Sequence, residues 1–243
     1  MTRLGVIYPG GGAEQDYYAF GERHDVRMFL AGSRIPAGDD HAVEALLHTA
    51  RVENLLEAAR RFATLDPDVV IWACTSGSFV VGREGAERQV EALRAATGRP
   101  ATSTSLAFVG ALAALGARRV AVVATYPEPA SRALAAFLRA FAIEVASLQW
   151  LDAPSGHDAA LIGHDRLADA VQRAAAVQPD AVVIPDTALP TMDRVGRLEA
   201  IAGCPVATAN QVTLWAALAL AGRPLVTEAY GRLFRLPSRE YAA

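Results

Sequence analysis

The sequence has few cysteines, no long apolar run and no excess of basic residues, and each absence excludes a class of protein. Its two cysteines, Cys74 and Cys204, cannot build a disulfide framework, so a reducing, cytoplasmic setting is expected. No apolar run approaches the length of a bilayer span, and the apolar stretch near Met1 is too short for a signal peptide, so no membrane partner is expected. With 23 basic against 26 acidic residues, the net charge of -3 offers no basic stripe for nucleic acid.

Metal-ligand patterns are missing as well. None of the five histidines forms a HExxH motif or a ligand pair on one face, so no metal is expected; they are His24, His41, His48, His157 and His164. The chain does have enough hydrophobic residues for a buried core. Of its 243 residues 52% are hydrophobic and 20% are charged, which is typical of one large folded domain or two small ones.

Val- and Ile-rich runs alternate with Ala-, Leu- and Arg-rich stretches along the chain. The runs predict strands at residues 4–7, 69–71, 100–102, 120–124, 181–184 and 205–208. The stretches predict helices at residues 42–62, 83–97, 105–115, 130–141, 165–177 and 214–221. Continuous apolar strands that alternate with helices indicate an α/β fold whose parallel sheets are covered on both faces. The helix at 105–115 is apolar enough to predict a homodimer or a higher homo-oligomer.

Three segments recur in the same order in both halves of the chain. Residues 3–9 resemble residues 119–127, residues 67–71 resemble residues 179–184, and residues 98–102 resemble residues 203–208. The repeat predicts two similar open parallel-sheet lobes, residues 1–117 and 118–243, related by pseudo-two-fold symmetry. We expect the site in the cleft between them, and we expect the C-terminal tail to complete the second lobe or to return to the first.

The repeat pairs two residues that can carry chemistry. Cys74 lies six residues after Asp68, and Asp186 lies six residues after Asp180, so both follow the carboxyl end of a strand. Ligands of open α/β sheets bind at that edge. If the lobes face each other, Cys74 and Asp186 approach one cleft from opposite sides.

The cysteine begins a loop of small polar residues. Backbone N–H groups and the hydroxyls of Thr75 and Ser76 could bind a carboxylate and lower the pKa of the Cys74 thiol. The alternative is an inert core cysteine. Asp186 is a candidate general acid or base, and its alternative role is to cap the following turn. Thr187, the next residue, is a candidate substrate-binding residue.

Aromatic and glycine-rich segments follow the first strand of each half. Tyr126 could donate a hydrogen bond to an oxyanion, or it could simply pack on the next helix. Pro9 and Gly10 open a run of three glycines that lets backbone approach a ligand, or that forms a plain turn. Cys204, whose counterpart is Arg99, falls at the opposite edge of its sheet and is expected to be structural.

These motifs resemble a known group of enzymes, and the resemblance covers nearly the whole chain. The loop at residues 74–79 and the segment Asn-Gln-Val-Thr-Leu-Trp at 210–215 are similar to those of maleate cis-trans isomerases. Residues 124–126 and 230–234 resemble arylmalonate decarboxylases of the same aspartate/glutamate racemase superfamily. The resemblance implies a two-lobed fold without metal or organic cofactor, and a small carboxylate substrate. It also implies that Cys74 adds to a double bond, that Thr75, Ser76 and Tyr126 bind a carboxylate or an enediolate, and that Asn210 lines the pocket.

The sequence departs from this pattern in two places. Maleate isomerases and racemases carry a second cysteine where this chain has Asp186, and arylmalonate decarboxylases carry only that second one. Three glycines, Gly10 to Gly12, also stand where maleate isomerases have an Asn-Thr pair. Three functions therefore stay open: a maleate isomerase-like isomerase, a decarboxylase or racemase in which Cys74 delivers the proton, and a carboxylate-binding protein without catalysis.

Overall fold

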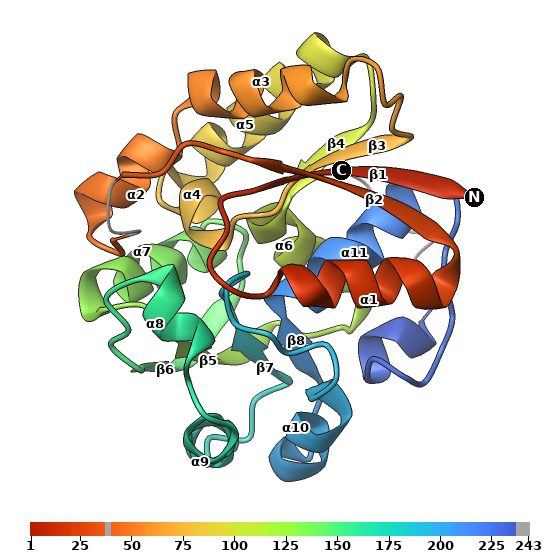
Figure 1. Cartoon of the computed structure of the whole chain (residues 1–243). Coiled ribbons are helices and arrows are strands. Elements are labelled where there is room, and N and C mark those ends of the chain that lie inside the picture. Colours follow the sequence, from red (N-terminus) through yellow and green to blue (C-terminus); the bar gives the residue numbers. More distant parts are fainter. Residues whose placement is uncertain (37–39, 237–243) are drawn as a thin grey trace.

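Two parallel sheets of four strands organise the molecule (Figure 1). The computed structural model describes residues 1–36 and 40–236. The first sheet has the order β2-β1-β3-β4 and consists of β1 (Thr2–Tyr8), β2 (Val26–Gly32), β3 (Val69–Trp72) and β4 (Ala101–Ser103). The second has the matching order β6-β5-β7-β8 and consists of β5 (Arg119–Ala124), β6 (Glu144–Trp150), β7 (Ala181–Ile184) and β8 (Val206–Thr208). The predicted α/β fold with two similar parallel-sheet lobes is confirmed.

Every strand in the middle of a sheet is buried on both faces, which explains the continuous apolar runs in the sequence. Alternate residues face opposite layers because side chains alternate along a strand. In β3, Ile71 belongs to the core that both sheets share, whereas Val70 and Trp72 belong to the outer core of the first lobe.

Helices fill three layers around the two sheets (Figure 1). The shared central core contains buried residues of α1 (Glu14–His24), α6 (Thr104–Ala114), α7 (Glu128–Arg139) and α11 (Ala209–Leu220). The outer layers are formed by α3 (Val52–Ala59) and α5 (Gly82–Thr97) on one side, and by α9 (His164–Ala175) and α10 (Val195–Ala202) on the other. The shorter elements are α2 (Val43–Thr49), α4 (Thr75–Phe79), α8 (Gly156–Ala160), η1 (Arg60–Phe62) and η2 (Arg232–Arg235).

The structure corrects several predicted elements. The helix expected at 42–62 is broken into α2, α3 and η1, because Arg51 is extended between them and the Asn54 side chain donates to the His48 carbonyl (2.8 Å). The helix expected at 214–221 begins at Ala209, because Thr208 and Gln211 form a capping box there. Among the described residues, the helices α1, α4, α8 and α10 and two of the edge strands, β2 and β6, were not predicted from the sequence.

The apolar helix that suggested an oligomer is α6, and its partner lies in the same chain. Phe108 and Leu112 are buried in the shared core, and Thr104 is hydrogen-bonded to Thr213 of α11 (Oγ1 to Oγ1, 2.8 Å). The apolar character of this helix is therefore accounted for by packing between the lobes. The predicted boundary near residue 117 falls in the turn between α6 and β5, and separate domains stay a prediction.

The C-terminal segment, up to the last described residue, Leu236, lies against the first lobe. The ring of Phe20 in α1 is 5.3 Å from that of Tyr230 and 6.0 Å from that of Phe234. The Tyr230 hydroxyl is also 2.8 Å from Nε2 of His24. Residues 237–243 of the predicted tail lie outside the described part of the chain. Within the described residues, no helix is long and apolar enough to cross a membrane.

Candidate active site

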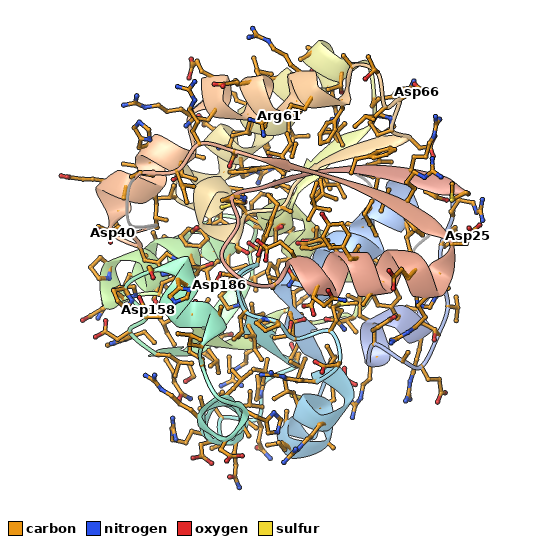
Figure 2. The ribbon with its side chains drawn as sticks, in the orientation of Figure 1. Asp25, Asp40, Arg61, Asp66, Asp158 and Asp186 are labelled. Atoms are coloured by element: carbon orange, nitrogen blue, oxygen red, sulfur yellow. The ribbon has the colours of Figure 1, made fainter. Side chains whose placement is uncertain are left out.

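In each sheet, the strand order leaves a crevice between two loops. After β1 the chain crosses to β2 on one side, and after β3 it crosses to β4 on the other, so the loops after β1 and β3 diverge and leave a crevice at the carboxyl edge. The second sheet repeats this arrangement at β5 and β7. In Figure 2 Asp186, which follows β7, lies near the middle of the molecule, whereas Asp25 and Asp66 lie at its periphery.

A small cavity lies where these loops meet, and both lobes line it. The lining residues are Pro9, Gly10, Ile35, Pro36, Asp40, His41, Leu46, Thr49, Cys74 and Ser76 from the first lobe, and Gly156, Asp186, Thr187 and Ala188 from the second. Its volume is about 20 Å³, which is room for about one water molecule. The space between these side chains is therefore narrow.

Cys74 is buried at the start of α4 and serves as the N-cap of that helix. Its Sγ accepts a hydrogen bond from the Gly77 amide (3.2 Å) and is 3.6 Å from the Ser76 hydroxyl. A side chain at Gly77 would lie 2.7 Å from the Trp72 ring and 3.1 Å from the sulfur, so glycine is needed for this close approach. A backbone N–H that points at sulfur stabilises the thiolate over the thiol.

Asp186 occupies the matching position in the second lobe with a different backbone. Its φ of 155° lies in a region that favours glycine, and such strain is often found at functional sites. The carboxyl accepts from the Thr125 hydroxyl (2.5 Å) and from the Ala188 amide (2.9 Å). It thus caps the following turn, as the alternative prediction states, and it lines the cavity as well.

The pKa of the Asp186 carboxyl is raised because the group is buried. The charge of His41 and the hydrogen bonds from Thr125 and Ala188 act in the opposite direction. The carboxyl is therefore available as a proton donor at a higher pH than an exposed aspartate would be.

Tyr126 is fully buried beside this pair. Burial raises the pKa of its phenol, as do the nearby charges of Asp186 and Cys74, whereas the hydroxyls of Thr75 and Ser76 lower it. A phenol in this state keeps its proton and can only donate that proton in a hydrogen bond to an anion. The structure thus brings Thr75, Ser76 and Tyr126 to the same place as the two candidate catalytic groups.

His41 is the residue that the sequence analysis missed. It comes from the loop before α2 and is buried, although loops usually lie on the surface. Its amide donates to the Pro154 carbonyl (2.8 Å), its Nδ1 lies 3.0 Å from the Ala153 carbonyl, and its ring meets Tyr126 edge-on (4.8 Å). No spacing pattern marked it, because these contacts come from the other lobe.

Asn210 lies outside the cavity lining. Its side chain accepts from the Tyr17 hydroxyl (2.9 Å) and donates to the Asp16 carboxylate (2.9 Å), and Asp16 also accepts from the Thr191 amide (3.0 Å). These bonds join α1 to the second lobe. Asn210 therefore contacts interface residues, whereas the predicted binding residue Thr187 lines the cavity and accepts from the Tyr8 hydroxyl through its carbonyl (3.1 Å).

Two other features lie away from this site. A larger hollow of about 420 Å³ opens beside the ion pair of Asp66 and Arg99, at the amino-terminal edge of the first sheet. Cys204 is half-buried, lines no part of the cavity, and has a thiol pKa raised by burial. No group of three His, Cys, Asp or Glu side chains is arranged to hold a metal in residues 1–36 and 40–236.

Comparison with known proteins identifies relatives of this chain. The family model for arylmalonate decarboxylase matches residues 42–234. Arylmalonate decarboxylase of Bordetella bronchiseptica is 32% identical over 210 residues, which cover 84% of this chain and 82% of that protein. Maleate isomerase of Nocardia farcinica is 26% identical over 254 residues, covering 98% and 97%.

Two solved structures share the fold over nearly their whole length. An arylmalonate decarboxylase variant in a liganded form, with one glycine changed to cysteine and one cysteine to serine, has a TM-score of 0.85 and 27% identity, covering 96% of this chain and 99% of that one. A Nocardia farcinica maleate cis-trans isomerase variant with a covalently bound succinylcysteine intermediate has a TM-score of 0.87 and 23% identity, covering 96% and 98%.

Fold and relatives together define a two-lobed α/β protein of the group of enzymes that includes maleate isomerases and arylmalonate decarboxylases. Within that group, the chain belongs to the arylmalonate decarboxylase family.

Proposed function

We propose that this protein is an isomerase of a small dicarboxylate, with Cys74 as nucleophile and Asp186 as proton donor and acceptor. One observation carries the proposal: a buried thiol and a buried carboxyl from matching positions of the two lobes line the same cavity. A substrate bound there has one group on each side. Cys74→Ala should therefore abolish turnover.

The proposed reaction uses both groups in turn. The Cys74 thiolate adds to one carbon of a cis double bond, forming the S–C bond, and the π electrons move onto the neighbouring carbon and its carboxylate. Hydroxyl donors, among them the fully buried Tyr126, stabilise this enediolate. Protonated Asp186 then delivers its proton to that carbon, which leaves a single C–C bond that can rotate. The reverse steps return the proton to Asp186 and expel the thiolate, leaving the trans acid.

Two properties of the site support these roles. The Gly77 amide favours the thiolate form of Cys74. Burial favours the protonated form of Asp186, as the proton-transfer step needs. The succinylcysteine described in the maleate isomerase variant is the adduct that thiol addition to a four-carbon diacid would form.

A decarboxylase is the second candidate, favoured by the family model and by the 32% identical relative. In that reaction a malonate-type substrate loses CO₂, and the enediolate left behind takes a proton from the Cys74 thiol. Ile35, Pro36 and Leu46 form an apolar part of the wall. Such a surface destabilises a carboxylate and favours its loss as neutral CO₂.

Proton NMR in D₂O separates the candidates. The wild type, Cys74→Ala and the matched control Cys204→Ala would be incubated with maleate, with phenylmalonate and with a panel of amino and hydroxy acids. Formation of fumarate that is lost only in Cys74→Ala supports the isomerase. Loss of CO₂ with one deuterium at the α-carbon supports the decarboxylase instead. Turnover that survives in Cys74→Ala contradicts both, and silence across the panel favours the binding protein.

A further inference from the structure

The wall of the cavity is unbalanced in charge. Three of its ionisable side chains, Asp40, Cys74 and Asp186, can only be neutral or negative, and the same is true of Tyr126 beside them. Among the described lining residues there is no lysine or arginine, and His41 alone can carry a positive charge. A carboxylate that enters this cavity loses its water, which is costly unless a charge or hydrogen bonds replace it.

The contacts of His41 settle which of its nitrogens can serve a ligand. A carbonyl oxygen only accepts, so the 3.0 Å contact with Ala153 requires a proton on Nδ1. His41 lines the cavity, and Nε2 is the ring nitrogen that this contact does not use. The backbone bond to Pro154 and the edge-on contact with Tyr126 hold the ring in this orientation. The second lobe thus positions a side chain that belongs to the first.

We propose that His41 is the cationic group that recognises the second carboxylate of a dicarboxylate substrate and thereby selects diacids over monoacids. Protonated His41 donates Nε2–H to one carboxylate, while the hydroxyls around Tyr126 bind the other. The inference rests on the proposed function in one respect, that the ligand is a carboxylate.

Proton balance follows from the groups that face His41. Asp40 is its neighbour in the chain, Cys74 lines the cavity from α4, and Asp186 and Tyr126 follow strands of the second lobe. A diacid adds two negative charges among groups that supply none of the opposite sign. Binding should therefore favour protonated His41 and protonated Asp186, so that diacid binding takes up protons from solution.

Calorimetry with two unreactive probes tests the inference. Succinate and propionate would be titrated into Cys74→Ala protein, with and without His41→Asn, in buffers of different ionisation enthalpy. Asparagine keeps a donor for the Ala153 carbonyl and removes the cation. We expect His41→Asn to weaken succinate binding by about 10-fold, the loss typical of one charge-assisted hydrogen bond, and to change propionate binding by less than about 2-fold. Proton uptake with succinate should fall as well.

The matched control is His157→Asn, which changes an exposed histidine of α8 next to the lining residue Gly156. It should leave both affinities and the proton uptake unchanged. Thermal denaturation of His41→Asn, and His41→Gln as a second neutral variant, identify a loss caused by misfolding. His41→Gln should weaken succinate binding in the same way.

Three outcomes would overturn the inference: equal losses for both acids, unchanged succinate binding in folded His41→Asn, or no succinate binding to the parent protein. None of these depends on turnover. If Cys74→Ala keeps its activity by NMR while His41→Asn loses succinate, the proposed function fails and the role of His41 stands.

Discussion

The loops after β3 and β7 occupy matching positions of the two lobes and differ in chemistry and in backbone. Cys74 caps a helix that starts at once, and its sulfur accepts an amide hydrogen bond three residues on. Asp186 caps only a turn, through the amide two residues on, and no helix begins before Val195. Position in the sheet fixes where a group meets the cavity, whereas the side chain decides how the chain continues.

The two groups also differ in what burial demands of their surroundings. A thiol is easily buried as a small apolar group, so its burial requires few polar partners. A carboxyl needs hydrogen bonds in the same setting, and Thr125 and Ala188 supply them to Asp186. Burial of the Asp186 carboxyl therefore depends on these two hydrogen bonds.

After the loss of the Cys74 thiol, replacing the carboxyl should produce the largest effect. Asp186→Asn keeps the shape of the side chain but removes its proton transfer, so kcat/KM should fall by about 10²- to 10⁴-fold. Steady-state kinetics with the substrate identified by NMR would measure the loss. Turnover within a factor of about two of the wild type would rule out Asp186 as the general acid.

The same variant has a second readout that needs no substrate. Since burial raises the pKa of Asp186, the folded protein holds that proton in a pH range where the unfolded chain has released it. Stability from this group is present at acid pH and is lost as pH rises through the folded pKa. The wild type should therefore lose stability relative to Asp186→Asn as pH rises, in thermal melts across that range.

Alanine substitutions at two other matching positions, Ser105 and Asn210, should have smaller effects, which differ between the two residues and appear in the free energy of unfolding. Ser105 donates to the Thr75 carbonyl within its own lobe (2.9 Å), and Ser78 donates to the same carbonyl. Asn210 joins Asp16 and Tyr17 across the interface. Asn210→Ala leaves both partners buried with fewer bonds and should cost about 1–3 kcal/mol of unfolding free energy, against about 1 kcal/mol for Ser105→Ala. Equal costs in urea denaturation would contradict this assignment to the interface.

The smallest effect is expected when the hydrogen bond from Thr125 to the Asp186 carboxyl is removed. Thr125→Val removes a hydrogen bond that favours the charged form of Asp186, so the pKa of that carboxyl should rise further. The protonated donor then persists to higher pH. The alkaline limit of kcat/KM should move upward with little change in its maximum, and the loss of unfolding free energy should be about 1 kcal/mol. A downward move of that limit would mean that the ionised carboxylate is the working form.

The sequence predicts the sheets well, because their inner strands are apolar on both faces and recur in each half. It misses the edge strands β2 and β6, because these two are only partly buried and carry polar residues such as Arg27 and Gln149, whereas the edge strands β4 and β8 are fully buried. The sequence also fails to predict the break in the helix expected at 42–62. Apolar periodicity continues through the break, and only the extended Arg51 interrupts it.

The residues of the candidate site also differ in whether the sequence predicts them. Cys74 and Asp186 could be found from the repeat, since each lies at a fixed distance after a strand. His41 and the second-lobe carbonyls that hold it lie 112 and 113 residues apart in the chain, and no local pattern records such a contact. For Asn210 the resemblance indicated a pocket, whereas the fold turns its amide toward α1.

The facing of the two lobes has a consequence for handedness. Under the proposed function, a planar carbon bound between them would present one prochiral face to Cys74 and the opposite face to Asp186. A proton that the thiol delivered to an enediolate would arrive from the first lobe only, and one from the carboxyl would produce the mirror-image acid. The enantiomer that accumulates would thus identify the donor, because the asymmetry of this chain lies in which lobe carries the sulfur.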